Sequence, residues 1–304
     1  MQKHKRSRET TQVYLENQPL PNHGKSYTVV SHREVIENTK QLLENSGFTI
    51  RKEIYRANTN AQVAQGIYHI HPTRSLVDKV NNESELGMMF AWTNSYDKSI
   101  RFQCAMGAYV MVCSNGMMCG DMMNFKRKHT GTAGHDIVMQ LSNQIKTGEK
   151  HYTRILDDRD ELRNITLTKR QQSELLGRLF ADDDIITSSQ MSIIKKEMKK
   201  PSYDYNCNDD NAWTFYNHVT HSLKVSTPRD WMQDSQNFHD FMMNNVLGNL
   251  PVQAKSDFDW QNVVVNNNNS DVDTTSLVDI QDHELIEVDE NISEGQLLYE
   301  AYTK

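Results

Sequence analysis

The chain has 304 residues, of which 37% are hydrophobic and 24% are charged, and its formal net charge is −7. That length supplies enough apolar material for the core of one large domain or two small ones. A mean hydropathy of −0.72 and the lack of any uninterrupted apolar run of about 18 residues exclude a chain built on membrane-spanning helices, and we expect no membrane partner.

The charge is unevenly distributed along the chain. Residues 251–304 contain twelve acidic residues and two lysines, a net charge of −10, whereas residues 1–250 carry +3. The body of the protein is therefore mildly basic, and the acidity is concentrated in the C-terminal segment. Such asymmetry predicts different roles for the two parts.

The N-terminal residues 1–26 are polar and basic, and Pro19, Pro21 and Gly24 interrupt them, which predicts a flexible arm without a helix. The stretch MQKHKRSRETTQ lacks the apolar segment of a signal peptide. The chain also has only four cysteines. We therefore expect reduced thiols and a cytoplasmic location.

A helix followed by four strands is predicted between residues 31 and 113. Ser31 and Glu34 fit a capping box and Gly47 suits a helix end, so the helix is expected at 32–45. Alternating apolar residues between turn signals predict strands at 48–57, 62–72, 85–95 and 99–113.

The last of these strands is expected to run from a half-solvated edge into a covered centre. Apolar residues alternate from Ile100 to Val112, with polar Arg101 and Gln103 between them only in the first half. Two successive hairpins predict an antiparallel sheet with one exposed face.

The second half of the chain is predicted to be helical. Apolar residues recur at helical spacing in 134–148, 166–183, 187–201, 208–224 and 227–246. We therefore predict a single α+β domain over residues 27–250, with its sheet at 48–113 and its helices at 134–246. Residues 251–304 are expected to form a polar linker and a disordered acidic tail.

Metal-site and catalytic motifs are weak. Pairs of histidines occur at His69 and His71 and at His218 and His221, but two ligands do not make a site, and no CxxC pair is present. Cys113 ends an apolar run and precedes the turn sequence SNG, which favours a buried structural thiol over a nucleophile. We predict no metal, no cofactor and no catalytic residue.

A basic loop is the most informative feature. Lys126, Arg127, Lys128 and His129 precede the glycine-containing sequence TGTAG. Cationic loops beside exposed aromatic rings are typical of single-strand nucleic-acid binding. The predicted binding residues are Arg101, Lys126, Arg127, Lys128 and His129 for phosphates, and Trp92 and Tyr96 for base stacking.

Parts of the sequence resemble the phage/plasmid-like protein family known as domain of unknown function 932. The resemblance rests on NSYDKSIRFQCAMGAYVMVCSNGM, on KRKHTG and on NAWTFYNHVTH, and covers about residues 30–245. The matching positions are Asn94, Ser95, Asp97, Cys113, Asn115, Gly116, Lys128, His129, Thr130, Gly131, Asn217 and Thr220; His218 stands where the family pattern has alanine. The resemblance implies a phage or mobile-element origin, hence the host cytoplasm, and no established activity.

The leading functional hypothesis is a phage-type DNA-metabolism protein that binds single-stranded nucleic acid without catalysing a bond change. Its predicted order of elements is similar to the core of strand-annealing and recombination-mediator proteins, and it is compatible with a homo-oligomer. The alternative is a protein–protein module that acts on a host or phage replication or recombination factor through residues 271–304. A third hypothesis is an enzyme that uses Cys113, His129 and His135.

Overall fold

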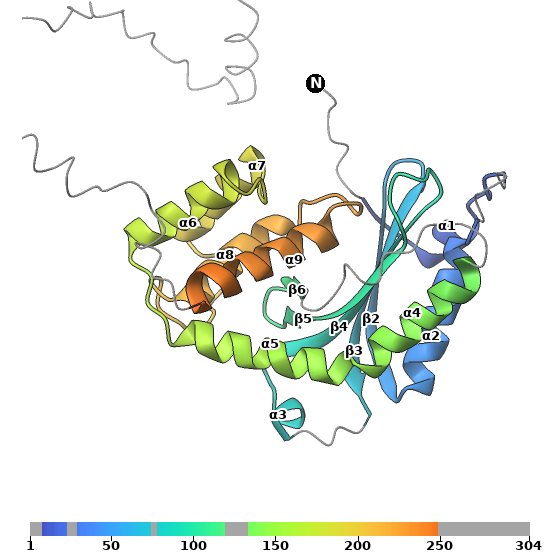
Figure 1. Ribbon diagram of the computed structural model, residues 1–304, viewed down its shortest axis with the longest axis horizontal. Helices are drawn as coiled ribbons and strands as arrows, with labels where there is room; N and C mark the ends of the chain where they lie inside the picture. The colour runs from blue at the N-terminus through green and yellow to red at the C-terminus, as the bar shows by residue number, and fades with distance from the viewer. Residues whose placement is uncertain (1–7, 23–28, 74–77, 119–132, 249–304) are drawn as a thin grey trace, which may run out of the picture. The chain divides into compact units, whose positions relative to one another are not determined.

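A computed structural model describes residues 8–22, 29–73, 78–118 and 133–248. All of them lie in the first of two compact units into which the chain divides, Met1–Ser256, and the second unit, Asp257–Lys304, lies outside the described residues. The described part is an α+β fold with a six-stranded antiparallel sheet and a helical C-terminal half, which confirms the predicted class (Figure 1).

The sheet follows the order of the chain, so every strand pairs with its sequence neighbour. The predicted strands at 48–57, 62–72 and 85–95 form within one residue of their expected limits. The strand predicted at 99–113 is shorter. The strands are β1 Arg8–Thr10, β2 Phe48–Ala57, β3 Val63–Pro72, β4 Leu86–Ser95, β5 Gln103–Val110 and β6 Gly116–Met118.

The helices begin where the sequence places capping residues. The capping box of Ser31 and Glu34 starts α2, and Thr168 and Thr187 start two later helices in the same way. The helices are α1 Gln12–Glu16, α2 His32–Asn45, α3 Asp78–Asn81, α4 Ala133–Lys146, α5 Gly148–Arg163, α6 Lys169–Ala181, α7 Ser188–Lys199, α8 Ala212–Leu223 and α9 Trp231–Met242, followed by the π-helical turn η2, Met243–Leu247.

Helices cover both faces of the sheet, and this overturns the expectation of one exposed face. Figure 1 shows α2, α4 and α5 on one side of the strands and α8 and α9 on the other. Two neighbouring residues of β4 demonstrate it: Asn94 donates from Nδ2 to the carbonyl of Val30, just before α2, at 3.1 Å. The Thr93 hydroxyl points the other way and lies 3.2 Å from the sulfur of Met232 on α9.

Three further features differ from the expectations. Within the predicted arm, residues 8–22 are structured, because β1 pairs with β2 and α1 buries Leu15 completely. Helix α5 was not foreseen, because its sequence is dominated by charged residues. The 99–113 segment is covered along β5, but Met111 and Val112, past the end of that strand, are exposed by 47% and 56%.

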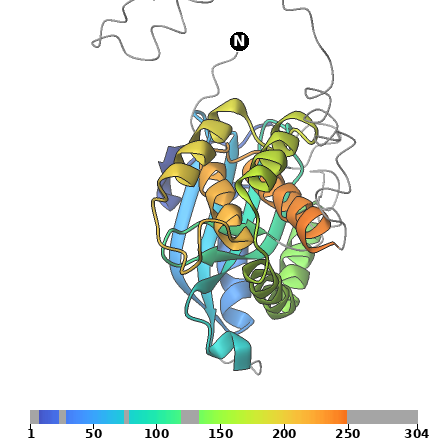
Figure 2. The same cartoon turned by 90° about the vertical axis from the view of Figure 1, so that its left-hand side faces the viewer.

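Figure 2 gives the perpendicular view, in which α6 to α9 gather over one side of the strands and α3 lies beyond their far end. In the described part of the chain, none of the helices has the length and apolar character needed to cross a membrane.

Candidate functional site

Of the residues predicted to bind nucleic acid, the structure describes Trp92, Tyr96 and Arg101, and it buries the two aromatic rings. Trp92 is 0% exposed and Tyr96 is 3% exposed. Arg101 is exposed in the turn between β4 and β5, and Lys126–His129 lie outside the described residues. The two predicted stacking rings are therefore unavailable to a ligand.

Each buried ring has a structural partner that explains its position. The Trp92 indole donates to the Tyr68 hydroxyl at 3.1 Å, and its ring covers Gly66, where an added Cβ would lie 2.5 Å from it. The Tyr96 ring stacks on His32 at 3.9 Å, and its hydroxyl accepts from the His32 backbone N–H at 2.7 Å. Trp92 therefore packs across β3, and Tyr96 joins the end of β4 to α2.

The cysteine and histidine motifs also have structural roles in the described residues. Cys113 is 5% exposed, and burial raises the pKa of its thiol, which opposes nucleophilic chemistry. Asn115 donates from Nδ2 to the carbonyl of Asn217 at 3.1 Å, so two positions of the recognised motifs join the β5–β6 turn to α8. Burial lowers the pKa of His218, which is 1% exposed. No group of three or more His, Cys, Asp or Glu side chains suited to a metal occurs within the described part.

An aromatic pair occupies the end of the sheet near α3. The rings of His69 on β3 and Tyr109 on β5 stack with their centroids 3.6 Å apart and an interplanar angle of 16°. The Tyr109 ring crosses β4 at Gly87, where a Cβ would lie 2.3 Å from ring carbons. Glycine is therefore required at position 87, and Tyr109 remains partly exposed.

Two cations of β2 lie beside this pair. Lys52 is exposed and lies opposite His69 in the β2–β3 register. Arg51 is exposed at a register shift between Ile50 and Lys52, a β-bulge of the kind that redirects a side chain. Neither cation forms an ion pair with any other residue that the structure describes. We call Arg51, Lys52, His69 and Tyr109 the Tyr109 platform.

Electrostatics at the platform favour an incoming anion. Burial, followed by the charge of Lys52, lowers the pKa of His69 to about 4, so the imidazole is neutral at pH 7. Burial raises the pKa of Tyr109, and the nearby Arg51 guanidinium opposes that rise. The aromatic pair therefore does not neutralise the positive charge of the two cations beside it.

A pocket opens beside the platform because two strands separate. Pairing of β3 with β4 ends at Ile70 and Met88. Nevertheless β3 stays paired with β2 as far as Pro72, and β4 stays paired with β5 from Leu86. A cavity of about 190 Å³ lies between these strand ends.

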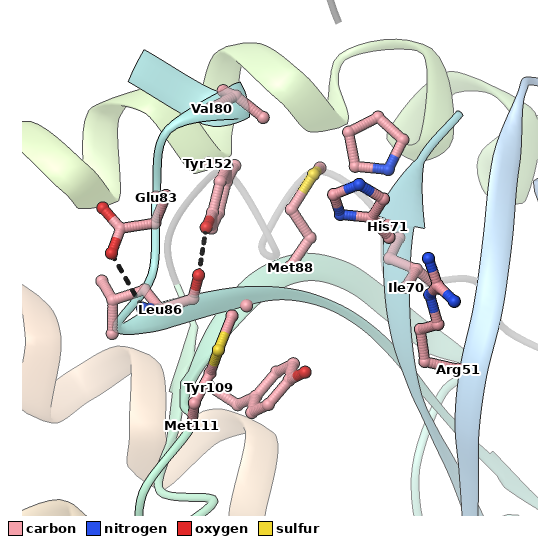
Figure 3. A pocket seen from close by; sticks show the side chains of 12 residues that line it. Arg51, Ile70, His71, Val80, Glu83, Leu86, Met88, Tyr109, Met111 and Tyr152 are labelled. Atoms are coloured by element: carbon pink, nitrogen blue, oxygen red, sulfur yellow. Dashed lines mark hydrogen bonds between the residues drawn. The ribbon is translucent and has the colours of Figure 1, made fainter. Parts of the chain in front are cut away.

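The two sides of the pocket come from different elements. Figure 3 shows Tyr152 and Val80 on the side of Met88, and Tyr109 and Met111 on the other. The Tyr152 hydroxyl on α5 donates to the Leu86 carbonyl at 2.5 Å.

A buried ion pair fixes the connection from α3 to β4. Arg159 on α5 contacts both carboxylate oxygens of Glu83 at 3.0 Å, and the two side chains are 8% and 7% exposed. The Glu83 carboxylate also accepts from the N–H groups of Glu85 and Leu86. Burial opposes ionisation of Glu83, but the bonds from Arg159 and the backbone outweigh it, and the pKa is lowered.

Sequence reasoning missed this site, although one signal was present. His69 and His71 were considered only as metal ligands, and the glycine at position 87 lies in an otherwise large-residue strand. A glycine inside a strand marks a place where something approaches the backbone closely, here the Tyr109 ring.

The comparisons with known proteins give one match. The family model described as Domain of unknown function (DUF932) matches residues 19–242. No curated protein and no solved structure matches the chain.

Proposed function

Since the chain belongs to the DUF932 family, whose description states no activity, we propose a function from the geometry of the Tyr109 platform: non-catalytic binding of single-stranded nucleic acid. The observation that carries the proposal is the stacked pair of Tyr109 and His69 beside two exposed cations of β2. Single-strand binding sites combine a ring on which a base stacks with positive charges that contact the backbone phosphates.

The surrounding charges support an anionic ligand. Glu83 is committed to Arg159, and Glu85 contacts Arg163 on α5. Glu53, next to Lys52 in sequence, pairs with Lys40 at 2.6 Å. Because these three carboxylates each have a cationic partner of their own, they leave the charges of Arg51 and Lys52 to an incoming phosphate.

The platform takes the place of Trp92, Tyr96 and Arg101 among the residues predicted from the sequence, while the chemistry stays the same; the predicted Lys126–His129 lie outside the described residues. Partly exposed Tyr109 takes the stacking role that was assigned to Trp92. Arg51 and Lys52 take the phosphate-binding role that was assigned to Arg101, which lies near the other end of β4 and β5. Phosphate contact predicts affinity that falls steeply with salt.

The test is binding of a fluorescent oligothymidine, followed by anisotropy across a salt series. Tyr109→Ala is expected to weaken binding by about 5- to 150-fold, because a base–aromatic stack contributes about 1–3 kcal/mol. Tyr14→Ala is the matched control, since Tyr14 is 43% exposed on α1 and outside the platform.

A charge variant tests the second half of the proposal. The double substitution Arg51→Ala/Lys52→Ala is expected to reduce the slope of log affinity against log salt by about 1.4, at about 0.7 for each phosphate contact. Lack of oligothymidine binding at low salt, or equal binding by the wild type and both variants, contradicts the proposed function.

A further inference from the structure

The pocket beside the platform opens where two strands stop pairing. Pairing of β3 with β4 ends at Ile70 and Met88, and residues of both strands next to this point line the pocket. Tyr109 and Tyr152 both line the pocket, and Figure 3 shows them on opposite faces of β4.

The lining is mostly apolar, with polar groups in a few places. Val80 is 4% exposed, Leu86 1% and Met88 2%, so these three side chains form a buried apolar wall. Arg51 and His71, both exposed, also line the pocket. Apolar walls with a small number of placed polar groups are the usual composition of a small-ligand site.

The acidic group at the pocket does not repel an anion-bearing ligand. The Glu83 carboxylate is neutralised by Arg159 and held by two backbone N–H groups. The Tyr152 hydroxyl already donates to the Leu86 carbonyl and has only its oxygen lone pairs to offer a ligand.

The volume limits what can enter. A cavity of about 190 Å³ equals the liquid volume of about six waters at about 30 Å³ each. It is smaller than the pockets of roughly 300–1,000 Å³ that hold drug-sized ligands. It therefore accepts one planar heterocycle but neither a base pair nor a stack of bases.

We propose that this pocket holds one unstacked nucleobase of the bound strand, while the neighbouring base stacks on Tyr109 and Arg51 contacts the phosphate near the opening. The inference rests on the proposed function and adds to it a reason for preferring unpaired strands. A duplex supplies such a base only by breaking a pair, whereas a single strand can turn one out of its stack at low cost.

Photocrosslinking separates the pocket from the outer surface. Oligothymidine in which one base is 5-iodouracil is bound to the wild-type protein, irradiated and mapped by mass spectrometry. Crosslinks to Met88 or Tyr152, on the inner wall, are the expected result. Crosslinks restricted to Tyr109 and Lys52 overturn the pocket but leave the proposed function intact, whereas failure to bind the oligonucleotide refutes both.

A filling variant gives an independent measurement. Val80→Phe extends a side chain into the cavity and is expected to abolish the inner-wall crosslinks and to weaken oligothymidine binding by about fivefold or more. Its binding to polyphosphate, which has no bases, is expected to equal that of the wild type. Val225→Phe is the control, because Val225 is 51% exposed and does not line the pocket. Equal loss of polyphosphate and oligothymidine binding by Val80→Phe contradicts the proposal.

Discussion

The substitution Gly87→Ala tests the platform without removing any functional group. The added Cβ would lie 2.3 Å from two ring carbons of Tyr109, whereas ordinary van der Waals contact requires about 3.4–4 Å. The ring must therefore move by more than about 1 Å. Because its centroid now lies 3.6 Å from that of His69, such a shift breaks the stacked arrangement.

Two magnitudes follow from the loss of the stack. An aromatic pair contributes about 0.5–1.5 kcal/mol beyond its buried area, so the free energy of unfolding is expected to fall by about 1 kcal/mol. Displacement of the Tyr109 ring is expected to weaken oligothymidine binding by about 5- to 150-fold, as Tyr109→Ala does. Urea unfolding and fluorescence anisotropy measure the two quantities, and Gly177→Ala is the control, since nothing lies within 4 Å of its new Cβ.

A double-mutant cycle decides whether the effect passes through the ring. If Gly87→Ala acts only by displacing Tyr109, the double variant Gly87→Ala/Tyr109→Ala binds no more weakly than Tyr109→Ala alone. Wild-type affinity in Gly87→Ala, or strictly additive losses in the double variant, would refute the reasoning.

Three further predictions concern other parts of the molecule. Glu83→Gln is expected to lower the free energy of unfolding at pH 7 by at most about 3 kcal/mol, because Arg159 keeps its bond to Asp160. The pKa of Glu83 is lowered below its ordinary 4.5, so the stabilisation by its carboxylate is present above about pH 4.5 and is lost as the pH falls. The urea midpoints of the wild type and Glu83→Gln should therefore converge in acid. Bound phosphate should raise the His69 pKa from about 4, because it favours the charged imidazole. The affinity for oligothymidine should therefore increase as the pH is lowered from 7 to 5. His69→Gln should remove this increase. Deletion of residues 266–304, which removes ten acidic residues and one lysine, is expected to strengthen oligothymidine binding, and unchanged or weaker binding would favour a partner-binding role for that segment.

Local sequence patterns predicted many of the elements but not their burial. The capping box at Ser31 and the period-two alternation around Cys104 are short-range signals, and they predict α2 at its observed limits and β5 with limits that are too wide. The sequence pattern does not predict helix α5, because charged residues outnumber the apolar ones in it. Its narrow apolar stripe includes Ile155 and Leu162, both 0% exposed. Burial of such a stripe against the sheet outweighs the polar composition.

The candidate site was less accessible to sequence reasoning, because it depends on how strands pair. Trp92 and Tyr109 are both aromatic residues in apolar strands, and only the register shows that one lies over Gly66 inside the core and the other over Gly87 at the open end. The position of Arg51 in the platform likewise depends on a β-bulge that no residue pattern predicts. Strand pairing, which amino-acid composition does not encode, therefore determines that Trp92 lies in the core and Tyr109 in the candidate site.

The serial order of the sheet has a consequence for biosynthesis. All six strands leave the ribosome before α8 and α9, the helices that cover the Thr93 side of the sheet. About 120 residues separate the end of β6 from the end of α9, and at about 5–20 residues per second their synthesis takes roughly 6–25 s. During that interval the nascent sheet presents an uncovered apolar surface, so chains truncated before Ala212 should aggregate or bind chaperones during translation, whereas full-length chains should not.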